Sequence, residues 1–428
     1  MGMSSNVGAL KEELLKWNWG ENTQGAVGDN AAGNKSSPVL VVGDHSFKTI
    51  SVQTGTHNIA QKEDGSTWAW GYNGYGGLGD LSINNKSSPV LVVGNHSFME
   101  ITGGTNWSGG LKADGSVWTW GYGTNGALGI GNIDNKSSPV PVIGNHSFIR
   151  ISGGQTSCMA LKADGSVWTW GNNLSAQLGD NTSDNKSSPV LVVGAHSFVQ
   201  ISSGGYFCAA IKSNGEIWMW GRDTYGQLGQ GTSIAYRSSP VLVVGNHSCV
   251  QISSGGYQTL ILKDDGSVWA WGRNEFYGEL GDGTLINRSS PVLVIGSSII
   301  EIATGSASSH VLNSDGTAWS WGYNSQGNLG DGTITSRSSP VLVVGSHSFI
   351  TYRRRFRWAA GTTCWGHDTA VTETNIRDFF GNWGGTGVVS GSGDTEKLGL
   401  LSNTSMESEV IYTGAVLVTL TKDKYQQS

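Results

Sequence analysis

Two short sequence markers recur in phase along this chain of 428 residues, seven times each. Their spacing of 49–51 residues is a fixed internal period, the signature of a repeat architecture. The Ser-Ser-Pro-Val tetrads have their prolines at Pro38, Pro89, Pro139, Pro189, Pro240, Pro291 and Pro340. The Trp-x-Trp-Gly tetrads begin at Trp17, Trp68, Trp118, Trp168, Trp218, Trp269 and Trp319. The chain therefore has to build one small unit seven times.

Each period predicts four short strands separated by turns. In the unit that starts at Phe98, we expect strands A to D at residues 98–102, 110–113, 116–120 and 140–143. The Asp114-Gly115 dipeptide between B and C is typical of a β-hairpin, because it tolerates positive φ. Four strands in a period near 50 are typical of a blade of a β-propeller. The only segment with a helical pattern, 9–16, lies outside the repeat.

The tryptophan pairs predict how neighbouring blades hold together. Residues i and i+2 of a strand share a face, so Trp118 and Trp120 are expected to point into one gap between adjacent sheets. Each buried aromatic side chain removes about 150–250 Å² from water. We therefore interpret the paired indoles as core residues rather than as a ligand cage or a light antenna.

The phase of the repeats predicts how the ring closes. Six complete units run from Phe47 to Val344, preceded by an orphan C–D half and followed by an orphan A–B start. Joining the halves gives an all-β, seven-bladed β-propeller of four-stranded blades without an exposed edge. The predicted organisation is a lead-in at 1–16, a propeller at 17–366 with the seventh blade shared between 17–42 and 349–366, a linker at 367–393, and a C-terminal β segment at 394–428.

Composition and charge exclude several classes of protein. The 65 Gly and 8 Pro stay below the roughly 25–30% that marks low-complexity disorder. A net charge of −6 argues against a broad nucleic-acid footprint, and four Cys do not make a disulfide framework. The first 15 residues have no apolar signal core, and no stretch reaches the length of a membrane helix, which favours a cytoplasmic protein without a membrane partner.

The unit Ala113-Asp-Gly-Ser-Val-Trp-Thr-Trp-Gly121, continued by Asn125-Gly-Ala-Leu-Gly129 up to Pro139, resembles the repeat of the regulator of chromosome condensation family. The resemblance covers roughly residues 17–350. It implies a seven-bladed propeller that binds another protein. Members of that family include a nucleotide exchange factor for a small GTPase, ubiquitin-ligase modules, a plant ultraviolet-B photoreceptor and a secreted β-lactamase inhibitor.

Two of these functions are disfavoured by the residues. The exchange factor inserts a β-wedge into its GTPase, and no unit here carries an insertion longer than one or two residues. The photoreceptor surrounds its tryptophans with a Trp-Arg-His-Thr pattern that these pairs lack.

Catalysis and cofactor binding are not predicted. Six His-Ser turns lie about one blade apart, so their imidazoles cannot converge, and we expect them to cap turns. Cys158, Cys208 and Cys249 are expected to be small buried residues, and no metal-ligand spacing appears. Asp80, Asp180, Asp282 and Asp331 are expected to form turns rather than calcium loops.

The seven copies differ most in the A–B loops and at the start of the C–D loops, which emerge on one face of the ring. Aromatic and Arg residues there have the composition of interface hot spots. The candidate binding residues are Tyr72, Trp107, Tyr122, Tyr206, Phe207, Arg222, Tyr225, Tyr257, Arg273, Phe276, Tyr277 and Tyr323. The sequence predicts a non-catalytic propeller that binds an unidentified protein. The alternatives left open are a carbohydrate-binding surface or phage-type fibre component, and unselected variation of loop tips.

The segment after Ile350 departs from the repeat. Tyr352-Arg-Arg-Arg-Phe-Arg357 stands where the next strand A should be, and either a shifted reading frame or a functional basic patch would account for it. With the sequence as it stands, closure through this segment should be weak, because buried unpaired Arg is costly. Residues 409–421 alternate in part and predict one or two further strands.

Overall fold

The computed structural model describes residues 11–12, 15–43, 45, 47–51, 56–245 and 247–345. In the C-terminal part it describes only the strands 352–358, 363–365, 388–390, 406–412 and 417–419. The chain divides into two compact units, Met1–Phe349 and Ile350–Ser428. No helix among the described residues is long and apolar enough to cross a membrane.

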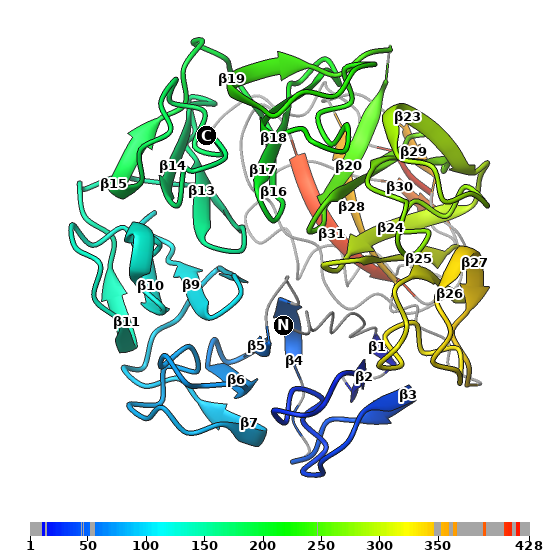
Figure 1. Ribbon diagram of the computed structural model, residues 1–428. Helices are drawn as coiled ribbons and strands as arrows, with labels where there is room; N and C mark the ends of the chain where they lie inside the picture. The colour runs from blue at the N-terminus through cyan, green and yellow to red at the C-terminus, as the bar shows by residue number, and fades with distance from the viewer. Residues whose placement is uncertain are drawn as a thin grey trace. The chain divides into compact units, whose positions relative to one another are not determined.

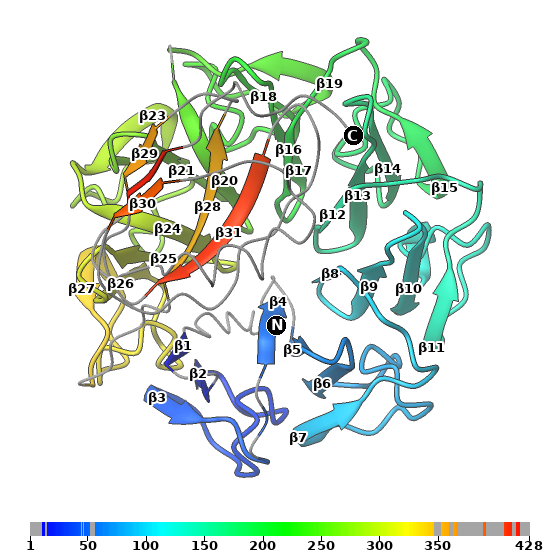
Figure 2. The same cartoon turned by 180° about the vertical axis from the view of Figure 1, so that it is seen from behind.

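The first unit is an all-β propeller of four-stranded antiparallel blades, ranged round a ring in Figures 1 and 2. Blade 1 contains β4 (Phe47–Ser51), β5 (His57–Lys62), β6 (Thr67–Gly71) and β7 (Lys86–Leu91). Blade 2 contains β8 (Glu100–Gly103), β9 (Trp107–Leu111), β10 (Val117–Gly121) and β11 (Lys136–Pro141), with the 3-10 helix η1 (Thr124–Gly126). Blade 3 contains β12 (Arg150–Gly153), β13 (Ser157–Leu161), β14 (Val167–Gly171) and β15 (Lys186–Leu191).

Blades 4 to 6 repeat the same meander. Blade 4 contains β16 (Gln200–Ser203), β17 (Phe207–Ile211), β18 (Ile217–Arg222) and β19 (Tyr236–Leu242). Blade 5 contains β20 (Cys249–Ser254), β21 (Gln258–Lys263), β22 (Val268–Gly272) and β23 (Arg288–Ile295). Blade 6 contains β24 (Ile299–Thr304), β25 (Ser308–Asn313), β26 (Ala318–Gly322) and β27 (Arg337–Leu342).

A smaller sheet, the N-terminal sheet, consists of β1 (Lys11–Glu12), β2 (Leu15–Gly20) and β3 (Lys35–Leu40) in that order. The segment expected to be helical thus contains strands, because Lys11 and Glu12 pair with Lys16 and Leu15. β2 and β3 are the predicted orphan C–D half.

The second unit, taken by itself, holds two small sheets. β28 (Tyr352–Trp358) pairs with β31 (Met406–Tyr412), and β32 (Leu417–Thr419) lies between β29 (Thr363–Trp365) and β30 (Val388–Ser390). β31 and β32 fall in the predicted C-terminal β segment, whereas β30 falls in the stretch predicted as a linker.

The predicted closure of the ring through 349–366 is wrong in its strand pairing. β2 has β1 as its neighbour on the side opposite β3, and β28, in the segment that was to provide strand A, pairs with β31 instead. Two physical reasons account for this. β1 is adjacent to β2 in the chain, so pairing them closes only a very short loop. The four Arg of 352–357 also replace the apolar and Gly residues that strand A has elsewhere.

The strand boundaries differ from the prediction in one informative way. Strand B of blade 2 starts at Trp107 instead of 110, and strand D starts at Lys136 instead of 140. Pro139 therefore lies inside β11, where a β-bulge shifts the register between Thr119 and Gly121. Proline is tolerated because β11 is an outermost strand with no partner on its other side.

The prediction for the tryptophan pairs is confirmed. Trp118 and Trp120 of blade 2 both pack against the apolar residues of blade 1, including Leu78 and Val92. The second tryptophan of every pair is fully buried, and the first is half-buried. Among the described residues, five such apolar clusters lie between consecutive blades, and two more include residues of the N-terminal sheet or of the segment that directly follows it.

Six of the seven buried second indoles also donate a hydrogen bond to the preceding sheet, and the exception is Trp170, whose Nε1 has no partner among the described residues. Trp120 Nε1 donates to the carbonyl of Gly77 at 3.0 Å, and Trp220 Nε1 donates to that of Gln177 at 3.0 Å. The same bond joins the N-terminal sheet to the last blade, from Trp19 Nε1 to Asn328 at 3.0 Å. A sheet-to-sheet contact 309 residues apart in sequence thus repeats the local pattern.

The first serine of Ser-Ser-Pro-Val explains why that tetrad recurs. Its carbonyl accepts a backbone N–H from the C–D loop of the preceding sheet, at 2.6–2.9 Å in all seven places. One of these bonds runs from Gly332 of blade 6 to Ser36 of β3. Gly226 shows how close the loop comes, since a Cβ on this positive-φ residue would lie 2.5 Å from Ser289 Cα. These contacts between neighbouring sheets, which we call joints, therefore tolerate little change in sequence.

A buried histidine makes one joint sensitive to acid. His57 Nε2 lies 2.7 Å from Ser108 Oγ of the next blade, and this hydroxyl donates to the Gly77 carbonyl at 2.8 Å. Burial lowers the pKa of His57 to about 4. Since the unfolded chain takes up this proton near pH 6.5 and the folded chain does not, stability contributed by neutral His57 falls as the pH drops from about 6.5 to about 4.

We expect His57→Gln to remove this acid sensitivity, since Gln258 occupies the equivalent position of blade 5. The parent should lose about 3 kcal/mol more unfolding free energy than the variant between pH 7 and pH 4. Urea unfolding at both pH values measures the difference. An equal change in unfolding free energy between pH 7 and pH 4 for the two proteins would show that His57 is not the source of the acid sensitivity.

Candidate functional site

Three positions of the repeat carry most of the variation on the loop face. They are the last residue of the A–B loop, the residue after Trp-x-Trp-Gly, and the residue three places later. In blade 4 these positions hold Tyr206, Arg222 and Tyr225, and in blade 5 they hold Tyr257 and Arg273 followed by Phe276 and Tyr277. In blade 3 they hold only Thr156, Asn172 and Ser175.

The structure brings eight of the predicted residues into one continuous group, which we name the arginine–tyrosine cluster. Its members are Tyr206, Arg222, Tyr225, Tyr257, Arg273, Phe276, Tyr277 and Tyr323, from blades 4, 5 and 6. The ring of Tyr257 lies at its centre, with centroids 5.9 Å from Tyr206 and 5.8 Å from Tyr225. Tyr277 extends the group to Tyr323 at 4.7 Å.

Two guanidinium groups lie against these rings. Arg273 Cζ is 4.1 Å from the Tyr257 centroid, and Arg222 Cζ is 5.6 Å from the same ring. Cation–π contacts of this length fix both the cation and the ring. Burial raises the pKa of Tyr257, while Arg222 and Arg273 oppose that shift. The phenol therefore stays neutral, able both to donate and to accept a hydrogen bond.

Arg273 is neutralised by an acid that the sequence analysis did not single out. Its Nε donates to Glu279 Oε1 at 2.7 Å, and the Glu279 side chain is fully buried. Burial raises the pKa of Glu279, and the Arg273 cation opposes this. The equivalent positions of blade 3 hold a neutral pair, Asn172 and Gln177, joined at 2.7 Å. Comparing the copies at these two positions would have revealed the pair.

A second, smaller aromatic group lies on blades 1 and 2. Tyr75 contacts Tyr72 at 6.0 Å and Tyr122 at 4.7 Å between centroids. Tyr75 was not among the predicted residues, although it occupies the same repeat position as Tyr225. It is 36% exposed, so it presents its ring to solvent more than its neighbours do.

Two of the predicted site residues are wrong. Trp107 and Phe207 are fully buried, because each is the first residue of a strand B rather than a loop tip. Trp107 packs with Trp170 of the next blade, and its Nε1 donates to the Gln155 carbonyl at 3.2 Å. Neither ring is available to a ligand.

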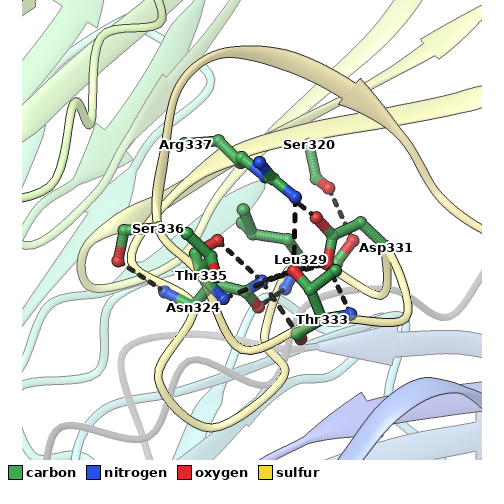
Figure 3. A network of polar contacts seen from close by, with 8 residues as sticks. All are labelled: Ser320, Asn324, Leu329, Asp331, Thr333, Thr335, Ser336 and Arg337. Carbon is green, nitrogen blue, oxygen red and sulfur yellow. Dashed lines mark hydrogen bonds and ion pairs between the residues drawn. The ribbon is translucent and has the colours of Figure 1, made fainter.

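A polar network holds the C–D loops that carry the cluster, as Figure 3 shows for blade 6. Asn324 Nδ2 donates to Asp331 at 3.0 Å, and its Oδ1 accepts the Leu329 N–H at 2.9 Å. Arg337 Nε donates to Asp331 at 3.1 Å. Burial opposes ionisation of Asp331, but bonds from Thr333 and Arg337 hold its pKa below the usual value.

The same network confirms that Asp80, Asp180, Asp282 and Asp331 organise turns. Each carboxylate accepts from an Asn amide seven or eight residues earlier and pairs with a Lys or Arg. Blade 2 lacks this network, since Gly123 and Ile130 replace the Asn and the Asp. Blade 4 also differs, since Asp223 takes the place of the Asn. Its carboxylate accepts the Leu228 and Ile234 N–H groups, and burial raises its pKa.

The described histidines of the His-Ser turns pack against tryptophans, and His247 also makes a capping bond of the kind that we expected, since its Nε2 lies 3.0 Å from the Val244 carbonyl oxygen. Each imidazole packs against the first tryptophan of a pair, as for His96 and Trp118 at 4.5 Å between centroids. The ammonium of a lysine at or directly after the end of strand B lies over the same indole, as Lys112 does at 4.1 Å. Burial and this cation lower the pKa of His96.

The three described cysteines are buried and free. Burial raises the pKa of Cys208 and of Cys249 to about 12, and it raises the pKa of Cys158 well above the usual value for a thiol. Since the thiolate is the nucleophile and the metal ligand, these thiols are inert at neutral pH. Within the described residues, no group of three His, Cys, Asp or Glu side chains is placed to hold a metal ion.

The Arg273–Glu279 pair predicts a measurable coupling. Glu279→Gln should cost about 3 kcal/mol, because it leaves a buried guanidinium without its carboxylate. The double variant Arg273→Asn/Glu279→Gln rebuilds the neutral pair of blade 3 and should regain more than half of that loss. Urea unfolding of the three proteins gives the coupling. A single variant as stable as the parent would show that the pair contributes nothing.

The fold and cluster can be compared with known proteins. The family model of the RCC1-like domain matches residues 136–416. The Arabidopsis thaliana "RCC1 domain-containing protein RUG3, mitochondrial" is 34% identical over 86 residues, 20% of this chain and 19% of that protein. Human HERC2, an E3 ubiquitin-protein ligase, is 30% identical over 92 residues, 21% of this chain and 2% of the ligase. The matches thus span about a fifth or less of these curated relatives.

Solved structures show the same fold at lower identity. Prp20p from Saccharomyces cerevisiae has a TM-score of 0.70 at 19% identity, covering 99% of this chain and 98% of that one. Human WBSCR16 has a TM-score of 0.70 at 20% identity, covering 78% and 94%. With two thirds of the chain matched by the family model, a ring of four-stranded blades and the repeated tryptophan joints, the chain belongs to the RCC1-like domain family.

Proposed function

We propose that this chain is a non-catalytic propeller scaffold that binds a protein partner through the arginine–tyrosine cluster. The observation that carries the proposal is the concentration of Tyr, Phe and Arg at three variable repeat positions of blades 4 to 6. Aromatic and Arg side chains dominate the energetics of protein interfaces. Phe276, an inserted residue that is 56% exposed, is the side chain best placed to enter a partner's pocket.

Relatives of the same fold support this proposal. Prp20p is described together with its binding to Gsp1p and histones, and yeast RCC1 (Prp20) has been crystallised with Kap60 bound. The loops here are held by buried polar networks, so the cluster is presented on a rigid base with little ordering cost on binding.

We expect the triple variant Arg222→Ala/Tyr225→Ala/Phe276→Ala to lose at least tenfold in partner recovery, since hot-spot residues cost about 2 kcal/mol or more each. Immobilised protein, an extract of the source organism and quantitative mass spectrometry provide the measurement. The control is Met99→Ala/Ile149→Ala/Val199→Ala, three exposed side chains from the connections at the other end of the strands.

Equal recovery by the triple variant and the parent would contradict the proposal. A glycan array separates the carbohydrate alternative, in which exposed rings such as Phe276 and Tyr75 would stack on sugars. Binding to glycans with no protein recovered through the cluster would favour that alternative.

We further propose that the N-terminal sheet is the seventh blade of the propeller. The bonds from Trp19 to Asn328 and from Gly332 to Ser36 support this, because they repeat the joints found between the other blades. The side chains of Trp17 and Trp19 likewise pack against Leu312 and Val343 of blade 6.

If this sheet closes the ring, Trp19→Ala should cost as much as Trp321→Ala, about 3–5 kcal/mol in each case. Both indoles are buried and donate the same kind of bond. Thermal and urea unfolding compare the two variants. A cost below about 1 kcal/mol for Trp19→Ala alone would place the sheet outside the ring.

A further inference from the structure

Arg222 differs from the other cations of the C–D loops in its surroundings. It is the last residue of β18 and is half-buried among three tyrosines. Its Cζ lies 5.6 Å from the ring of Tyr206, 5.8 Å from Tyr225 and 5.6 Å from Tyr257. Its Nε donates to Thr224 Oγ1 at 3.0 Å. The guanidinium is therefore fixed by one hydrogen bond and three aromatic rings.

The charge of Arg222 has no acid to balance it in the described part of the chain. The two arginines of the C–D loop network of blade 5 are paired, Arg288 with Asp282 at 2.8 Å and Arg273 with Glu279 at 2.7 Å. Asp223, the acid next in sequence, directs its carboxylate to the N–H groups of its own loop. Nη1 and Nη2 of Arg222 make no hydrogen bond to any residue that the structure describes.

We propose that Arg222 receives the carboxylate of an Asp or Glu side chain of the partner, an inference that rests on the proposed function. A guanidinium with two free Nη groups matches a carboxylate in a paired geometry, and such bonds are about twice as strong as neutral ones. The surrounding tyrosine rings hold the guanidinium in place and displace water, so Arg222 loses little side-chain entropy when the carboxylate binds. The specificity of the cluster is thus for a protein segment that combines one acidic residue with apolar contacts to Phe276.

The repeat supplies a matched substitution for the test. Tyr72, Tyr122 and Tyr323 occupy the position of Arg222 in blades 1, 2 and 6. Arg222→Tyr therefore removes the charge and introduces a residue that this position holds in other blades. Arg222→Lys keeps the charge but removes the guanidinium with its two Nη donors. Lys136→Gln, which removes one positive charge from the start of β11 in blade 2, controls for net charge. Thermal unfolding and near-ultraviolet circular dichroism check that the variants keep the parent fold.

The experiment selects displayed random dodecapeptides on the full-length protein. We expect the enriched peptides to share an Asp or Glu. A synthetic peptide of that sequence should bind at least tenfold more weakly to Arg222→Tyr, and its acid-to-amide version should bind equally weakly to the parent. Arg222→Lys should lose less affinity for the peptide than Arg222→Tyr does. The affinity of Lys136→Gln should be within twofold of that of the parent.

The outcomes separate this inference from the proposed function. Binding that is lost in Tyr225→Ala/Phe276→Ala but unchanged in Arg222→Tyr would overturn the acidic anchor and leave the protein-binding surface standing. Peptide binding indifferent to all these substitutions would overturn both. A single-stranded oligonucleotide serves as a second probe, and binding to it through Arg222 without any preference for acidic peptides would also overturn the inference.

Discussion

The structure depends on the joint made by one fully buried indole per sheet. That side chain supplies apolar area, the dominant favourable term in folding, and in every sheet but blade 3 its N–H also donates to a carbonyl in the loop of the sheet before it. The loop in turn donates a backbone N–H to the serine carbonyl of the next sheet. Packing and hydrogen bonding thus act across the same gap.

Because the sheets are joined in this way, the residues on the loop face can vary. The Asn–Asp–Lys or Asn–Asp–Arg networks fix the C–D loops from beneath, so the residue after Trp-x-Trp-Gly can be Glu, Tyr, Asn or Arg without changing the backbone. Blade 4 achieves the same with an acid in place of the Asn, and its loop is one residue longer. Variation is thereby concentrated at a few outward positions, where it can change what the ring recognises at little cost in stability.

Much of the fold could be predicted from the sequence because its signals repeat. A single Trp-x-Trp-Gly would have been ambiguous, but its recurrence with Ser-Ser-Pro-Val fixed the period, the strand count and the shared face of the paired indoles. The errors lie where the repeat gives no help. Trp107 was expected at the end of a loop, where its side chain would face solvent. It is instead the first residue of β9, and because side chains alternate along a strand, its indole points into the core. The partner of β2 depended on residues without repeat character, and Tyr75 was missed because aromatic residues were not compared position by position.

The buried indole of each sheet packs against the sheet before it, and this gives the ring a direction. In six of the seven places the indole N–H also donates to a loop carbonyl of that sheet, so the sheets are joined head to tail, like the subunits of a cyclic assembly fused into one chain. Such an arrangement closes only when the last rotation brings the two kinds of edge together. A molecule opened at the N-terminal sheet would expose two unlike edges that fit each other, and copies in that state would be able to join end to end. If the N-terminal sheet closes the ring as we propose, these two edges pair within one chain and are not available to other copies.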